Sequence, residues 1–142
     1  MVYVPADIVA RFWSYLMLLK STPARYYGLN PVQFLALLLI GETTLGLSIK
    51  QLRERMAVPG SSLSFTLDSL ERKRLIARRR SKQNRRQWFL YLAPEGKRLH
   101  SDLLTKESEA LVPALEGFTD FEREAFLKIA GEISRRESGR YE

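Results

Sequence analysis

The spacing of the hydrophobic residues changes twice along the chain. Two segments in the middle, 76–80 and 87–92, have the short length that is typical of strands, and in the second Trp88, Leu90 and Leu92 alternate with Phe89 and Tyr91. The segments on either side repeat their apolar residues at helical spacing. Helices are expected over residues 5–20, 30–41, 48–56, 61–74 and 94–114, and again after Thr119. The pattern predicts a mainly α chain with a small β-hairpin, in the order four helices, hairpin, two helices.

Polar residues mark where several of these helices begin. Asn30 precedes Pro31, which suits the first turn of a helix. Ser48 is followed three residues later by Gln51, and Thr119 three residues later by Glu122. Each of these two pairs is a capping box, in which two side chains satisfy free N–H groups at a helix start.

The helices over 48–56 and 61–74 are separated only by a brief turn that contains Pro59 and Gly60. Two short helices joined in this way indicate a helix-turn-helix. At 100° per residue, Leu63, Leu67 and Leu70 of the second helix share one narrow stripe, which we expect to face the core. The opposite face and its flanks hold the remaining residues of interest: Ser61, Ser62, Ser64, Phe65, Asp68, Ser69 and Arg72.

Small polar residues at a helix start suit close approach to phosphates and base edges. The alternative is that these serines are only caps, which is a common role for serine. We expect Asp68 to pair with Arg72, one turn further along the helix.

The positive charge of the chain is concentrated in one place. The net charge is +7, yet residues 71–86 alone hold nine Lys/Arg and one acidic residue. A focused patch of this kind points to a polyanion, and nucleic acid is the most common one. The stretch RRRSKQNRR, residues 78–86, places Lys82, Arg85 and Arg86 at the tip of the expected hairpin. The alternative is a solvated surface loop without a partner.

Composition excludes several classes of function. The chain has no cysteine and a single histidine, His100, so thiolate metal sites, multi-histidine metal sites and disulfides are excluded. No phosphate-binding loop, metal-ligand spacing or nucleophile motif is present, so neither catalytic residues nor a cofactor are expected. The longest apolar run, FLALLLI, is too short to span a membrane, and the N-terminus does not have the pattern of a signal peptide. A cytoplasmic protein is expected.

From Leu29 to Gly96 the chain resembles the MarR family of winged helix-turn-helix transcription regulators. The resemblance rests on the order and spacing of four blocks: LNPVQFLALLLI, LSIKQLRERM, GSSLSFTLDSLERKRLIARRRS and KQNRRQWFLYLAPEGKRL. It implies a homodimer in which the outer helices, residues 1–28 and 94–142, interlock and residues 29–93 form the DNA-binding domain. The recognition helix would enter the major groove of double-stranded DNA, and the hairpin would act as a wing. Carried onto this chain, the residues at the DNA are Lys50, Gln51, Ser61, Ser62, Ser64, Phe65, Lys82, Arg85 and Arg86.

Four positions depart from the family's pattern. Asn84 stands where an aspartate usually pairs with the wing arginine, so a weaker hold on Arg86 is expected. Arg74 replaces a glycine after the recognition helix, which calls for a strained left-handed residue or a changed turn. Ala93 replaces a capping threonine, and Phe65 stands where a longer polar or basic residue is frequent. Phe65 would touch a thymine methyl group or, alternatively, pack against the neighbouring helix.

The resemblance implies a repressor that binds a pseudopalindromic operator. Many members of the family release DNA when a small aromatic or lipophilic effector binds, and here such a pocket would be lined by Phe12, Trp13, Tyr15, Tyr26 and Tyr27. Those aromatic residues are also explained by a core or dimer interface. Other roles stay open: an architectural or replication-associated DNA-binding protein, a ligand-independent regulator, a protein-interaction module or an enzyme.

Overall fold

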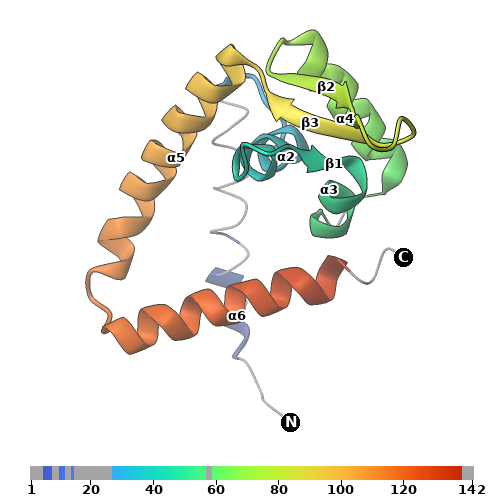
Figure 1. The fold of residues 1–142 in the computed structure, drawn as a ribbon. Helices are drawn as coiled ribbons and strands as arrows, with labels where there is room; N and C mark the ends of the chain where they lie inside the picture. Colours follow the sequence, from blue (N-terminus) through green and yellow to red (C-terminus); the bar gives the residue numbers. More distant parts are fainter. Residues whose placement is uncertain (1–4, 8–9, 12–13, 15–26, 57–58, 139–142) are drawn as a thin grey trace.

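The structure, a computed structural model, describes residues 5–7, 10–11, 14, 27–56 and 59–138. These residues contain five helices of seven or more residues and a three-stranded antiparallel sheet (Figure 1). In chain order the elements are α2 Pro31–Gly41, β1 Leu47–Ser48, α3 Ile49–Arg55, α4 Gly60–Arg72, β2 Ile76–Arg80, β3 Trp88–Leu92, α5 Pro94–Leu115 and α6 Asp120–Ser138. The mainly α architecture with a hairpin is confirmed. The first expected helix, over residues 5–20, lies mostly outside the described residues.

The expected helix starts are confirmed by their hydrogen bonds. The Ser48 hydroxyl accepts from the Gln51 N–H at 3.1 Å, and the Gln51 side chain accepts from the Ser48 N–H at 2.9 Å. Asn30 caps α2 and forms a reciprocal box with Gln33 as well. At α6 the Glu122 carboxylate accepts from the backbone N–H and the hydroxyl of Thr119. Both hydrogen bonds lower the pKa of Glu122, and the bond from the Thr119 backbone N–H has the larger effect.

The sheet has one strand more than the sequence pattern predicts. Strands β2 and β3 pair antiparallel from Ile76 opposite Leu92 to Arg80 opposite Trp88. The additional strand β1 pairs Leu47 with Leu90 and Ser48 with Phe89, which gives the order β1-β3-β2. A strand of two residues has no periodicity to detect, so it could only be found from its partner.

The core of the described residues lies between Leu29 and Leu103 and is built around α2. Helix α2 packs against α3, α4, α5 and β3, which explains why its sequence is apolar on nearly every side. The buried stripe of α4 is confirmed, since Leu63, Leu67 and Leu70 are each at most 2% exposed. Thr66 of the same helix is buried too.

The chain leaves α4 through a left-handed residue. Arg74 has φ +58°, so the strained turn that the missing glycine called for is confirmed. The N–H of Leu75 bonds to the Leu70 carbonyl at 3.0 Å, and the N–H of Arg74 bonds to the Glu71 carbonyl at 2.9 Å. This pair of bonds is a Schellman motif, which satisfies the last carbonyls of the helix. The turn sends the chain directly from α4 into β2.

The start of α5 lies against this turn. The N-cap Ala93 forms no side-chain cap bond, in agreement with its replacement of threonine, but its N–H bonds to the Leu75 carbonyl at 2.9 Å. Helix α5 then leads away from the sheet to α6, which passes below α3 in Figure 1. No helix in the described ranges is both long enough and apolar enough to cross a membrane.

Candidate nucleic-acid interface

The N-terminal half of α4 exposes a surface of small hydroxyl groups with one aromatic ring. Ser61, Ser62 and Ser64 are exposed, and Phe65 is 65% exposed. The N-cap of the helix is Pro59, and no side chain caps it. The serines are therefore not occupied as the N-cap of α4, and most of the Phe65 side chain is accessible to a partner. The exposed N–H groups of the first turn and the serine hydroxyls can all donate hydrogen bonds.

Helix α4 is fixed on α2 by a polar contact as well as by its leucines. The Gln33 side-chain NH₂ donates to the Ser69 hydroxyl at 2.9 Å, and Gln33 is buried. The expectation that Ser69 belongs to the outer face is therefore wrong, because its hydroxyl is turned toward α2. A buried amide needs a partner, and Ser69 supplies one.

The expected pair of Asp68 with Arg72 is also wrong. Asp68 forms an ion pair with Arg78 of β2, and Nε of Arg78 lies 3.3 Å from the carboxylate of Glu71 without the geometry of a hydrogen bond. Arg78 is the least exposed member of this trio, with a side chain 26% exposed. It joins the base of the hairpin to α4, so this arginine has a positioning role and its charge is largely neutralised.

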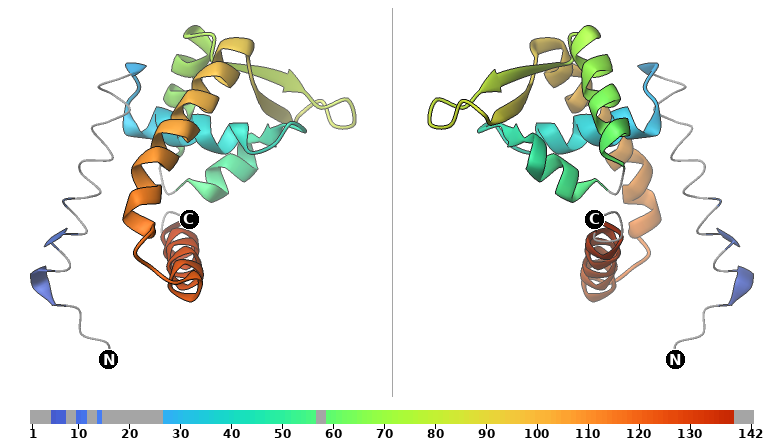
Figure 2. Two further views of the ribbon diagram at one scale, coloured as in Figure 1. Left: turned by 90° about the vertical axis from the view of Figure 1, so that its left-hand side faces the viewer. Right: turned by 90° about the vertical axis from the view of Figure 1, so that its right-hand side faces the viewer.

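The hairpin β2–β3 extends beyond the body of the domain (Figure 2). Its tip is ordered by its own side chains. The Ser81 hydroxyl accepts from the N–H groups of Gln83 and Asn84, both at 3.2 Å. The Asn84 side chain accepts from the Arg86 N–H at 3.1 Å, and the Asn84 carbonyl accepts from the Gln87 N–H at 2.9 Å.

Asn84 thus shapes the backbone of the tip and does not hold the Arg86 side chain. The role of Ser81 was not predicted from the sequence, and Asn84 was expected to matter only for the Arg86 side chain. Serine and asparagine often form turns in which the side chain accepts a hydrogen bond from a nearby backbone N–H group. This tendency is the sequence signal that could have revealed both roles.

The basic side chains of the hairpin fall into two groups. Near the strands, the Arg79 guanidinium lies 5.1 Å from the centre of the Tyr91 ring, and that of Arg80 lies 4.9 Å from the centre of the Trp88 ring. At the tip, Lys82, Arg85 and Arg86 are exposed, and none has an ion-pair partner among the described residues. Among the described residues, the tip therefore carries three uncompensated positive charges at the end of a projecting hairpin.

The start of α3 has fewer free side-chain groups for contact with DNA than the sequence indicated. Lys50 is exposed, and its ammonium group lies 3.9 Å from the carboxylate of Glu54. The carbonyl oxygen of the Gln51 side chain is used in the capping box. Only its NH₂ group is left to donate. In the right-hand view of Figure 2, α4 lies in front and α5 behind.

No group of three or more His, Cys, Asp or Glu side chains in the described part of the chain could hold a metal ion. The arrangement of α3, α4 and the hairpin β2–β3 defines a winged helix-turn-helix protein. The comparisons with known proteins make this class more specific.

The model of the MarR family matches residues 27–87. The uncharacterized HTH-type transcriptional regulator YsmB of Bacillus subtilis (strain 168) is 30% identical over 117 residues, which are 78% of this chain and 77% of YsmB. The HTH-type transcriptional repressor YetL of the same strain is 27% identical over 90 residues, which are 63% of this chain and 54% of YetL. The crystal structure of NadR in complex with 4-hydroxyphenylacetate has a TM-score of 0.79 and 18% identity, and the match covers 95% of this chain and 96% of NadR.

The chain belongs to the MarR family of DNA-binding transcription regulators. These regulators are not enzymes, so the enzymatic alternative is excluded.

Proposed function

We propose that this regulator is a repressor that binds a pseudopalindromic operator as a homodimer. The observation that carries the proposal is the joint exposure of the α4 hydroxyl face and the uncompensated tip of the hairpin. Lys82, Arg85 and Arg86 would contact phosphates, while Ser61, Ser62, Ser64 and Phe65 would lie against base edges in the major groove. Lys50 and Gln51 would contact the backbone at the start of α3. A dimer bound at a promoter would block transcription, and the similarity to the repressor YetL supports this role.

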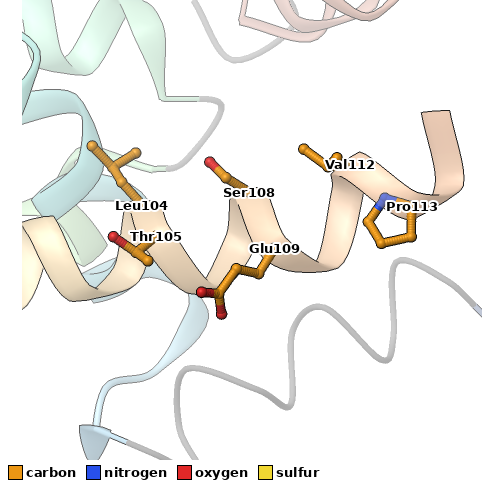
Figure 3. Close-up of a pocket in the computed structure, with 6 residues that line it drawn as sticks. All are labelled: Leu104, Thr105, Ser108, Glu109, Val112 and Pro113. Atoms are coloured by element: carbon orange, nitrogen blue, oxygen red, sulfur yellow. The ribbon is translucent and has the colours of Figure 1, made fainter. Parts of the chain in front are cut away.

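The dimer is supported by the apolar surface of α5 and α6. Seven large hydrophobic residues of these helices and the turn between them are 47–80% exposed in the single chain: Leu104, Val112, Phe118, Phe121, Phe126, Leu127 and Ile129. Such an accumulation is costly in water and is typical of an interface. Figure 3 shows Leu104, Ser108 and Val112 along one side of α5 beside a hollow whose other lining residues are Thr105, Glu109 and Pro113. We infer that residues 1–28 and 94–142 form the dimer and that residues 29–93 form each DNA-binding domain.

A small effector would bind beside Tyr27. Of the five aromatic residues expected in the effector pocket, Phe12, Trp13, Tyr15 and Tyr26 lie outside the described residues. Tyr27 lines a cavity of about 490 Å³ together with Lys73, Leu75, Glu95, Arg98, Leu99 and Asp102. Its hydroxyl is buried and has no hydrogen-bond partner among the residues that the structure describes. A buried hydroxyl of this kind favours a ligand that supplies the missing partner. The complex of the structural neighbour NadR with 4-hydroxyphenylacetate gives further support.

The proposal is tested by fluorescence anisotropy with duplex DNA from just upstream of the coding sequence of this protein. A shuffled duplex of the same composition is the control, and both are titrated at several salt concentrations. A repressor of this kind is expected to bind the native duplex at least about 10³-fold more tightly, with half-sites about 10 base pairs apart. Equal, salt-sensitive affinity for the two duplexes would favour the architectural role instead. No binding at low salt would eliminate the DNA site and leave the protein-interaction alternative.

Phe65 is expected to recognise thymine through its methyl group. The exposed start of α4 has no amide, arginine or lysine to make a bidentate contact with a purine, so apolar contact is its main means of discrimination. Phe65→Ala should weaken binding to the native duplex by roughly tenfold, or about 1.4 kcal/mol, and leave binding to the shuffled duplex unchanged. Phe65→Leu, which keeps an apolar contact, is the matched control.

Operator duplexes with deoxyuridine in place of thymidine separate this contact from a loss of shape. The unmodified protein should lose affinity for the uracil duplex, whereas Phe65→Ala should bind both duplexes equally. If the unmodified protein binds the two duplexes with the same affinity, Phe65 does not read thymine. Because Phe65 is largely exposed, neither substitution is expected to unfold the domain.

A further inference from the structure

A further cavity lies on the face of the sheet that is turned away from α4. Successive side chains of a strand point to opposite faces, and Arg78 points toward Asp68 and Glu71 of α4. Its neighbour Arg79 therefore points to the other face, where it lies over the Tyr91 ring. The cavity beside this pair has a volume of about 420 Å³. It is separate from the exposed face of α4 and from the Tyr27 cavity.

Four segments line this cavity and bring basic and hydroxyl groups together. The lining consists of Gly41, Thr43, Thr44, Arg79, Tyr91, Leu92, Lys97 and His100. Arg79 and Lys97 come from β2 and α5, and both are basic side chains. No carboxylate is among the lining residues, and neither cation has an ion-pair partner in the part of the chain that the structure describes. The cavity therefore has an excess of positive charge and of hydrogen-bond donors.

Several of these groups are held in place. The Tyr91 hydroxyl donates to the Leu45 carbonyl at 3.1 Å, which fixes the ring beneath Arg79. The Thr43 hydroxyl accepts from the Leu45 N–H at 3.2 Å, so its own hydrogen is left to donate. The half-buried His100 ring lies so close to Gly41 that a Cβ on that glycine would be 2.2 Å from Nε2. This packing fixes the imidazole at the wall of the cavity.

We propose that this cavity binds a small dianion, with a phosphate monoester as the best match. Arg79 would supply a planar pair of donors, Lys97 a point charge, and Thr43, Thr44 and His100 further donors. The volume is within the range of about 300–1,000 Å³ that is usual for small-molecule sites. The ring of Tyr91 would lie against the organic part of the ligand.

A phosphate group has two sources here, a small molecule and the DNA backbone. The position of the cavity on the sheet face opposite α4 favours the small molecule, because DNA bound to α4 would lie on the other side of the sheet. The DNA-binding proposal and this one are independent, since neither needs the residues of the other.

Isothermal titration calorimetry of the unmodified protein with glycerol 3-phosphate, at constant ionic strength, tests the proposal. Glycerol is the uncharged control ligand. One ligand is expected to bind each chain, with at least tenfold weaker binding in Arg79→Gln and in Lys97→Gln. Lys128→Gln is the matched control variant, because it removes the same charge from the exposed surface of α6 and Lys128 lines neither this cavity nor the Tyr27 cavity. Its affinity for glycerol 3-phosphate should equal that of the unmodified protein.

The midpoints of thermal unfolding, measured without ligand, show whether each variant is folded. Equal weakening in all three variants would mean that the phosphate senses only overall charge, and it would overturn the proposal. The absence of binding heat in the unmodified protein would overturn it as well. If Arg79→Gln and Lys97→Gln instead weaken binding to operator DNA, with no heat from glycerol 3-phosphate, the two cations serve the DNA backbone and the small-molecule site is refuted.

Discussion

Replacing Arg85 and Arg86 together by alanine is expected to weaken DNA binding by about 30-fold, for native and shuffled duplexes alike. The two side chains are exposed at the tip of the hairpin and have no acidic partner among the described residues. A lysine or arginine beside a polyanionic surface contributes about 1 kcal/mol, and two such contributions correspond to the stated factor. Each phosphate contact releases counterions, so the slope of log affinity against log salt should fall by about two units.

Anisotropy titrations over a range of salt concentrations measure both quantities. Gln83→Ala, a neutral change at the same tip, and Arg98→Ala, which removes a charge from α5, are the controls and should both leave the slope unchanged. Loss of affinity for the native duplex alone would indicate that the tip reads bases in the minor groove. An unchanged slope in the double variant would show that the tip does not touch DNA.

Gly96→Ala is expected to destabilise the domain by about 3 kcal/mol, which is at the upper end of the usual cost of overpacking. A Cβ on Gly96 would lie 1.9 Å from the Leu75 carbonyl oxygen, which is backbone and cannot rotate away. Helix α5 would have to move away from the turn after α4. This movement would strain or break the bond from the Ala93 N–H to the same carbonyl.

Thermal unfolding at a fixed protein concentration is the appropriate measurement, because the proposed dimerisation would make the midpoint depend on concentration. Gly60→Ala serves as the control, since a Cβ there has no neighbour within 4 Å. If Gly96→Ala unfolds at the same temperature as the unmodified protein, the contact between α5 and Leu75 is looser than the structure has it.

Local signals in the sequence account for most of the elements but not for the contacts between them. The capping boxes at Ser48 and Thr119 placed their helices, because the groups involved are three residues apart in the chain. The partner of Asp68 was misjudged for the opposite reason. The chain offers Arg72 at helical spacing, whereas the partner in space, Arg78, comes from a strand whose direction only the fold defines.

The proposed DNA-contact residues also were predictable where the signal lies within one helix and not where it depends on contacts between elements. Helical angle identified the exposed face at Ser61 and Phe65, because the leucines opposite them define the core side. The angle placed Ser69 outside as well, and only the position of Gln33 in α2 shows that its hydroxyl is occupied. The cavity at Arg79, Lys97 and His100 has no counterpart in the sequence pattern, since it is assembled from four separate segments.

The strand order β1-β3-β2 leaves two open edges, and each is protected in its own way. Strand β1 has only two residues, too few to serve as a template for another chain. Strand β2 is longer, but it carries Arg78, Arg79 and Arg80 along its free edge. Charged side chains on an edge strand discourage the strands of other molecules from pairing with it. The arginines of β2, which precede the tip of the hairpin, therefore also reduce the tendency of the sheet to aggregate.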